Sequence, residues 1–241
     1  MNAADLPPAP RLPLRSGARA RRPTRPRSLS REALVATALE IIDAEGLDAM
    51  TMRTVAHSLG TGAASLYAHV SGKEELLELV IERVIGELEL PGEPDSERWQ
   101  EQIKACSRSM RALFARHGDL ARATFARIPL GENALRWSEW MIAVLRGAGL
   151  PEQVIAYACD LLPLYVMAHA YEESLFASEG TAPDQARAFV EDLRSYFASL
   201  PVERFPNVVS LAGPLTAGAE GDERFEFGLE VLLRGLAAMP G

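Results

Sequence analysis

Apolar side chains recur through most of the chain every three or four residues, the spacing that gathers them on one face of an α-helix. The first clear case is the set Leu34, Ala38 and Ile41. Ser30 precedes this set as a helix-capping residue, and Gly46 follows it as a helix-ending residue. We therefore predict a first helix between Ser30 and Gly46.

Two short helices and a longer one are predicted next. Thr51 precedes a short run with helical periodicity that ends at Gly60, and a second short helix is expected over residues 63–69. A third helix is expected from Lys73, because a sustained apolar stripe follows it. Residues 91–94 contain two prolines and a glycine, so we place a domain boundary there.

The rest of the chain has the same helical periodicity. It predicts helices over residues 96–116, 119–127, 133–146, 151–178, 183–200 and 222–239. Residues 201–221 are rich in proline and are expected to form a loop. Since no strand pattern is evident, the predicted fold class is all-α, with an N-terminal three-helix domain and a larger C-terminal helical bundle.

Charge is distributed unevenly along the chain. The net charge is −8, but residues 1–31 hold eight arginines and one acid, Asp5, so this segment carries +7 and the remainder −15. Residues 1–28 are also rich in proline and lack apolar periodicity, which predicts a disordered arm. A basic arm on an acidic body is typical of a nucleic-acid-binding tail, although a solvated leader would have the same composition.

The cysteines and the hydropathy of the chain allow predictions about metal binding, membrane association and cellular location. Cys106 and Cys159 have no neighbouring cysteine or histidine at metal-ligand spacing, so we predict no metal site and no cofactor. No run of 18 consecutive apolar residues is present, and the N-terminus lacks the apolar segment of a signal peptide. We therefore expect a cytoplasmic protein with no membrane partner.

The two short helices around residues 51–69 are the strongest functional signal. Two short helices joined by a glycine-containing turn form a helix-turn-helix, whose second helix enters the major groove of DNA. Between Thr51 and Lys73 the chain has no acid, and its basic side chains include Arg53 and His57. DNA phosphates approach such a surface without repulsion. We therefore predict a DNA-binding helix-turn-helix here.

The same residues carry a family resemblance. Leu66 and Tyr67 are followed by His69, Val70 and Lys73, and the pair Leu59-Gly60 and the run Thr51-Met52-Arg53-Thr54-Val55-Ala56 precede them. This pattern resembles the tetracycline-repressor (TetR) family of transcriptional regulators. The C-terminal part is similar, more loosely, to the helical regulatory domain of that family, through residues 227–230 and 233–236.

The resemblance implies roles for residues of the helix-turn-helix. Tyr67, His69 and Lys73 match positions that contact the DNA backbone, and Arg53 matches a position that reaches a base in some members. Since residues 62–64 offer almost no side-chain hydrogen bonding, we expect the arm to add contacts in the minor groove. The predicted DNA-binding residues are Arg25, Arg27, Thr51, Arg53, Thr61, Gly62, Ala63, Ser65, Tyr67, His69 and Lys73.

The resemblance also implies a homodimer on a double-stranded DNA operator and a small-molecule effector. We expect a repressor that its ligand releases from a palindromic operator. The domains would be the arm at 1–28, the DNA-binding domain at 29–90 and a ligand-binding and dimerisation domain at 95–241. Helices 151–178 and 222–239 are the candidates for the dimer interface.

Large side chains of the body are the candidates for ligand binding. Pro163 lies inside an apolar helix that it should kink, and kinked helices often border cavities. Tetracycline is not the expected ligand, because residues 119–128 lack the metal-chelating histidine of tetracycline repressors, although His117 lies just upstream. The predicted ligand-binding residues are Phe125, Trp137, Met141, Tyr165 and His169.

Two other functions are compatible with an all-helical chain. In the first, the body of a DNA-binding regulator binds a protein partner instead of a small molecule. In the second, the helical body is an enzyme whose cavity is lined by aromatic side chains. The sequence lacks the GxSxG, HExxH, P-loop and GxGxxG motifs, so we predict no catalytic residues and no enzyme.

Overall fold

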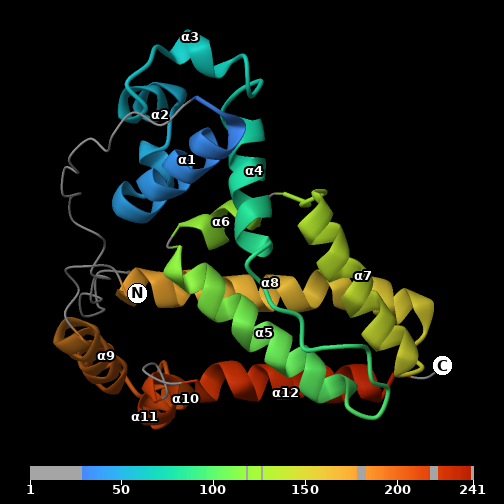
Figure 1. The fold of residues 1–241 in the computed structure, drawn as a ribbon. Helices are drawn as coiled ribbons and strands as arrows, with labels where there is room; N and C mark the ends of the chain where they lie inside the picture. Colours follow the sequence, from blue (N-terminus) through green and yellow to red (C-terminus); the bar gives the residue numbers. More distant parts are fainter. Residues whose placement is uncertain (1–28, 118, 126, 178–182, 218–221, 240–241) are drawn as a thin grey trace. The chain divides into compact units, whose positions relative to one another are not determined.

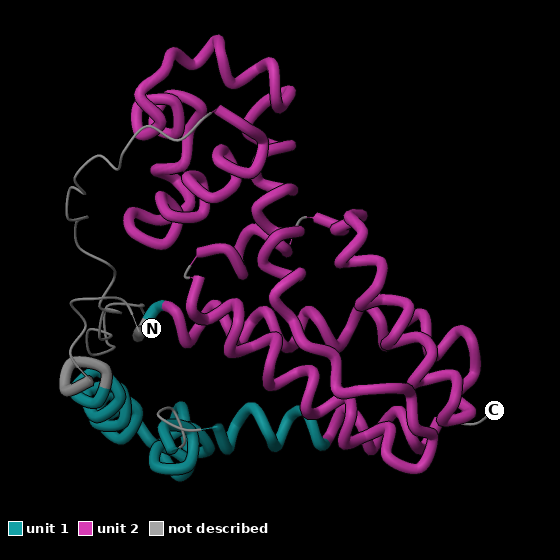
Figure 2. The backbone as a smooth tube through the Cα atoms, in the orientation of Figure 1, with its two compact units in different colours: residues 1–16, 175–230 teal, residues 17–174, 231–241 magenta. Residues whose placement is uncertain are grey.

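The computed structural model describes residues 29–117, 119–125, 127–177, 183–217 and 222–239, and within these ranges it contains helices and no strand. Contacts divide the chain into two compact units, which Figure 2 distinguishes by colour: residues 17–174 with 231–241, and residues 1–16 with 175–230. These units do not coincide with the expected DNA-binding domain at 29–90 and body at 95–241, and that division stays a prediction.

The first helix has the caps that the sequence predicts. Helix α1 spans Arg31–Glu45, and the Ser30 hydroxyl accepts a hydrogen bond from the Ala33 amide at 3.2 Å. Gly46 ends α1 with a φ of 87°, a left-handed value that glycine adopts without steric cost. A short 3₁₀ turn, η2 (Leu47–Ala49), follows and was not predicted.

Three further helices complete the N-terminal part. They are α2 (Met52–Ser58), α3 (Ala63–Leu66) and α4 (Lys73–Ile85). The prediction of a helix as far as residue 69 was wrong, because the Val70 and His69 amides both bond to the Leu66 carbonyl and close the chain into a turn. Leu66 is fully buried and anchors this turn.

Helix α4 joins the N-terminal helices to the body (Figure 1). Its buried face, which includes Leu76, Val80 and Val84, packs against α1 and also meets α7. The body helices in this unit are α5 (Trp99–Arg116), α6 (Leu120–Thr124), α7 (Glu132–Gly147) and α8 (Glu152–Ala177). The last of these continues beyond residue 174 into the other unit.

The second unit contains α9 (Pro183–Ala198), α10 (Pro206–Ser210), α11 (Ala212–Thr216) and the first half of α12 (Glu223–Ala237). Helices α10 and α11 both pack against α9. The prediction of a loop over residues 201–221 was wrong for 206–210 and 212–216. Pro206 and Pro214 lie in first turns, where the amide that proline lacks has no partner within the helix.

Candidate nucleic-acid interface and ligand cavity

The start of α2 is held by a reciprocal cap. The Thr51 hydroxyl accepts a hydrogen bond from the Thr54 amide at 3.1 Å, and the Thr51 amide donates to the Thr54 hydroxyl at 2.9 Å. The Thr54 hydroxyl also donates to the Ala49 carbonyl at 2.8 Å, which ties η2 to α2. Thr51, a predicted DNA contact, therefore also has a structural role as the helix cap.

The turn between α2 and α3 depends on Gly60. Its φ of 67° is left-handed, and the Thr61 amide bonds to the Ala56 carbonyl at 3.0 Å to close the turn. Gly62 then caps α3 in an extended conformation. With Val55, Ala56 and Leu66 buried beneath them, the two helices form the helix-turn-helix that the sequence predicts.

The predicted DNA-binding residues differ in exposure. Arg53, Gly62, Ser65 and Tyr67 are exposed, and 57% of the Tyr67 surface is accessible. The half-buried members of the set are Thr51, Thr61, Ala63, His69 and Lys73. Arg25 and Arg27 lie outside the described residues. The structure thus brings an arginine, a serine and a tyrosine side chain to the surface of one short segment.

Polar contacts hold the segment that follows α3 against α1. Arg31 donates to the His69 carbonyl at 3.2 Å and forms an ion pair with Glu75. Glu75 in turn accepts a hydrogen bond from the Ser71 amide at 2.6 Å, and this bond holds the pKa of the Glu75 carboxyl below its usual value. The orientation of α3 relative to α1 is therefore maintained by polar contacts as well as by the apolar core.

A cavity of about 480 Å³ lies in the body, beside the end of α4. Its walls come from α5, α7, α8 and the segment between α6 and α7, and Ile85 contributes from the end of α4. Most of the lining is apolar, with aromatic or sulfur-containing side chains at Met110, Phe114, Phe125, Trp137, Cys159 and Met167. The polar exceptions include Arg127 and Asp160.

Two of the five predicted ligand-binding residues, Phe125 and Trp137, line this cavity. Met141 is buried and borders a separate void of about 10 Å³. Tyr165 and His169 do not line the cavity, and their rings contact each other with centroids 4.7 Å apart. Their spacing on α8 does put both on one face, but on a different face from the cavity-lining positions of the helix.

Sequence reasoning missed Arg127 and Asp160. Arg127 follows a short helix, and the sequence around it has no periodic pattern from which the direction of its side chain could be predicted. Asp160 belongs to an apolar helix, where an acid usually marks the solvated face. Pro163 was the usable signal, since it does line the cavity, as its place inside α8 suggested.

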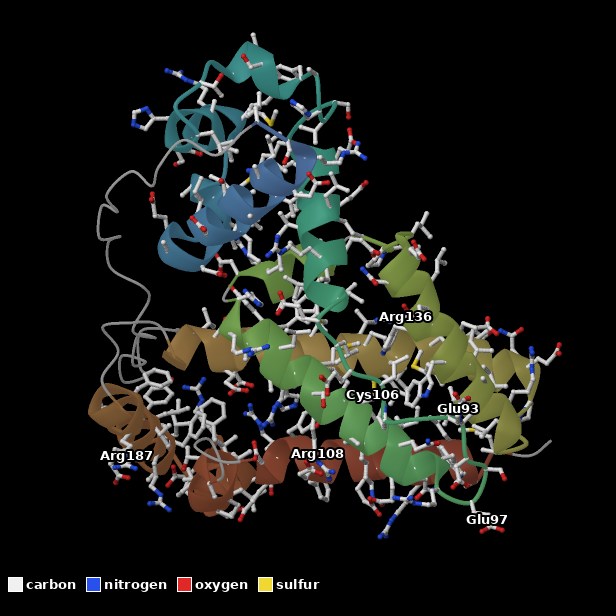
Figure 3. The ribbon with its side chains drawn as sticks, in the orientation of Figure 1. Glu93, Glu97, Cys106, Arg108, Arg136 and Arg187 are labelled. Atoms are coloured by element: carbon white, nitrogen blue, oxygen red, sulfur yellow. The ribbon has the colours of Figure 1, made fainter. Side chains whose placement is uncertain are left out.

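The two cysteines differ in environment. The indole nitrogen of Trp137 donates to the Cys106 sulfur at 3.3 Å, across the contact between α5 and α7, and Figure 3 labels Cys106 there. Burial raises the pKa of the Cys106 thiol to about 11. Cys159 is half-buried on the cavity wall, and burial raises the pKa of its thiol too.

The cavity wall is bonded directly to α4. Glu82 of α4 accepts hydrogen bonds from the amides of Asn133 and Ala134 (the latter at 3.3 Å), so its carboxylate caps the N-terminus of α7. The Asn133 side chain donates back to the Glu82 carbonyl at 3.2 Å. Nearer the start of α4, Glu74 forms an ion pair with Arg127. Two acids on α4 therefore contact the segment that encloses the cavity.

A second set of contacts joins the body to α1 and η2. Asp119, just before α6, accepts a hydrogen bond from the Leu47 amide at 3.1 Å. His117 lies 3.1 Å from a carboxylate oxygen of Asp43, and Arg122 lies 3.5 Å from Asp48. The His117 imidazole thus forms part of a structural contact.

Comparison with known proteins agrees with this architecture. Residues 34–80 match the family model described as bacterial regulatory proteins, tetR family, and residues 90–240 match that of the tetracyclin repressor-like C-terminal domain. The HTH-type transcriptional repressor DrrR1 of Streptomyces coeruleorubidus is 35% identical over 226 residues, which cover 91% of this chain and 82% of the relative.

Solved structures of similar proteins include complexes with small molecules. The TetR family protein ActR of Streptomyces coelicolor in complex with (S)-DNPA is 46% identical, with a TM-score of 0.78, and the match covers 89% of this chain and 100% of ActR. ActR in complex with actinorhodin is 47% identical, also with a TM-score of 0.78, over 87% of this chain and 96% of ActR.

Proposed function

The chain belongs to the TetR family of transcriptional regulators, and we propose that it represses transcription from a palindromic operator until a small molecule binds its body. The main support for this proposal is the exposed, acid-free surface of α2 and α3. Tyr67 and Lys73 would contact phosphates, and Arg53 would bind a guanine edge in the major groove.

Dimerisation would double the contact with DNA. Members of the family are dimeric, and a dimer places two recognition helices on half-sites one turn of DNA apart. An apolar stripe on α8 supports an interface there: Tyr157, Leu161 and Leu164 follow helical spacing, and Tyr157 is 67% exposed. Residues Glu152–Leu175 of α8 are also apolar and long enough to cross a membrane, but a helix with one face in a core and another in an interface needs the same composition.

A charge on the stripe tests the interface. We expect Leu161→Glu to give a monomer in analytical ultracentrifugation and to weaken operator binding, because the carboxylate would be desolvated against the partner. Ala156→Glu is the matched control, since Ala156 is exposed on the same helix and lies off the stripe. Dimers of equal stability from both variants would place the interface elsewhere.

The cavity supports a small-molecule effector over a protein partner. Its volume of about 480 Å³ falls within the range of roughly 300–1,000 Å³ typical of ligand pockets. The side chains of Phe114, Phe125 and Trp137 favour an aromatic ligand. ActR, which is similar over most of the chain, binds (S)-DNPA and actinorhodin in its structures. We propose an aromatic effector of comparable kind for this chain.

Release from DNA would follow from the bonds between the cavity wall and α4. A ligand that moves the segment between α6 and α7 changes the positions of Glu74 and Glu82, and hence of the helix that follows α3. The ligand acts only as far as it binds one arrangement of α4 better than the other.

Selection from a random-sequence DNA library tests the proposed function. We expect the protein to enrich a palindrome whose half-sites are about one helical turn apart. The variant Tyr67→Phe should enrich the same motif with lower affinity, because the lost hydroxyl contacts the backbone. Recovery of unrelated sequences in proportion to their abundance would contradict the proposal.

A further inference from the structure

Arg127 occupies a position between the cavity and the DNA-binding helices. It lines the cavity, and among the described residues that do so it has the one positively charged side chain. One guanidinium nitrogen donates to the Ala123 carbonyl at 3.0 Å, and the other terminal nitrogen pairs with Glu74 of α4. The Arg127 side chain is 26% exposed and that of Glu74 is 71% exposed.

Arg127 borders two hollows whose linings differ. Toward the cavity the wall is mostly apolar, with Phe125 and Trp137 among its members. Arg127 also borders a second hollow of about 330 Å³, whose lining includes the acids Glu75, Glu78 and Glu82. Three acids there repel an anion, whereas Asp160 is the one acid among the described residues that line the cavity, so an anion approaches Arg127 more favourably from the cavity.

The pairing with Glu74 is exchangeable. Glu74 is mostly exposed, and water screens an ion pair with such a partner. A carboxylate or sulfonate on a ligand inside the cavity would meet the same guanidinium in a drier environment, where charge-assisted, bidentate hydrogen bonds are stronger. The planar fork of arginine suits both kinds of acid group.

We propose that the effector is an aromatic acid whose anionic group displaces Glu74 from Arg127. This inference rests on the proposed function, because it assigns the chemistry and the action of the ligand in the same cavity. The exchange releases the first turn of α4, which begins at Lys73, directly after the segment that follows α3. Asp160, also on the cavity wall, disfavours an anion near α8, so the acid end of the ligand points toward Arg127.

Two fluorescent dyes with the same rings test the proposal in the full-length protein. Anilinonaphthalene sulfonate carries an acid group, whereas N-phenylnaphthylamine is its neutral counterpart. We expect both dyes to compete for one site. The substitution Arg127→Met should weaken sulfonate binding roughly 10-fold or more, because a charged hydrogen bond is lost, and leave the neutral dye within about 2-fold.

Two further variants separate the exchange from a general loss of structure. Glu74→Gln should tighten sulfonate binding severalfold and leave the neutral dye unchanged, because the competing carboxylate is gone. Arg122→Met is the matched control: Arg122 also pairs with the N-terminal part, at Asp48, but does not line the cavity. It should change the affinity of neither dye.

The possible outcomes separate a failure of the anion exchange from a failure of the ligand cavity itself. If neither dye binds at a single competitive site, the cavity is not a ligand site, and the proposed function fails together with this inference. If the neutral dye binds but the sulfonate affinity is the same in wild type, Arg127→Met and Glu74→Gln, the anion exchange is overturned and the ligand cavity stands. Equal weakening of both dyes by Arg127→Met would also overturn the exchange.

Discussion

The cap that Glu82 places on α7 yields the sharpest prediction for stability. The carboxylate accepts the amides of Asn133 and Ala134, two donors that have no partner within the helix at its N-terminus. Losing such a cap costs about 1 kcal/mol, and losing a negative charge at the positive end of a helix costs about 0.3–1 kcal/mol more. The substitution Glu82→Gln keeps one acceptor oxygen and removes the charge, so we expect a loss of about 1 kcal/mol in unfolding free energy.

For a chain of 241 residues this loss lowers the melting temperature by about 2–4 °C. Thermal unfolding followed by circular dichroism measures it, with Glu78→Gln as the control. Glu78 is exposed on α4, one turn before Glu82. Its substitution removes the same charge without changing the cap of α7. If the two variants melt at the same temperature, the carboxylate does not stabilise α7, and the link from α4 to the cavity wall would have to lie elsewhere.

Two further substitutions and one labelling experiment test other features of the protein. Gly131→Ala would place a methyl group against the Glu82 carboxylate, so we expect a loss of stability that is not additive with Glu82→Gln in a double-mutant cycle. Tyr67→Phe should weaken binding to operator and random DNA by the same factor, as measured by fluorescence anisotropy, since a phosphate contact carries no sequence information. Cys106 is buried, and burial raises the pKa of its thiol to about 11, whereas Cys159 is half-buried, so a thiol reagent should label Cys159 alone until the protein unfolds. A dye bound in the cavity should slow the labelling of Cys159. Mass spectrometry of the labelled peptides measures this, and an equal rate of labelling with and without dye would contradict a dye site beside Cys159.

The helices with clear end signals could be predicted from the sequence. Ser30 and Gly46 bound α1 as expected, and Thr51 caps α2. Local chemistry decides such ends, because a side chain near the helix satisfies the free amides. The end of α3 could not be predicted in this way, since burial of Leu66 turns the chain before residue 69.

The cavity depends on tertiary packing and was only partly predictable. Trp137 and Phe125 were expected from size and clustering, and both line it. Arg127 was missed because it pairs with Glu74, a residue 53 positions away in the chain. No periodic pattern records a contact between a loop and a distant helix.

A competition titration at fixed salt would show whether the protein recognises a specific DNA sequence. The purified protein would be titrated against its own promoter region with random DNA as competitor, because affinities for DNA depend steeply on salt. We expect a preference of about 10³ or more for one palindromic segment over random DNA. Equal affinity for both DNAs would contradict a sequence-specific regulator and would mean that binding rests on charge alone.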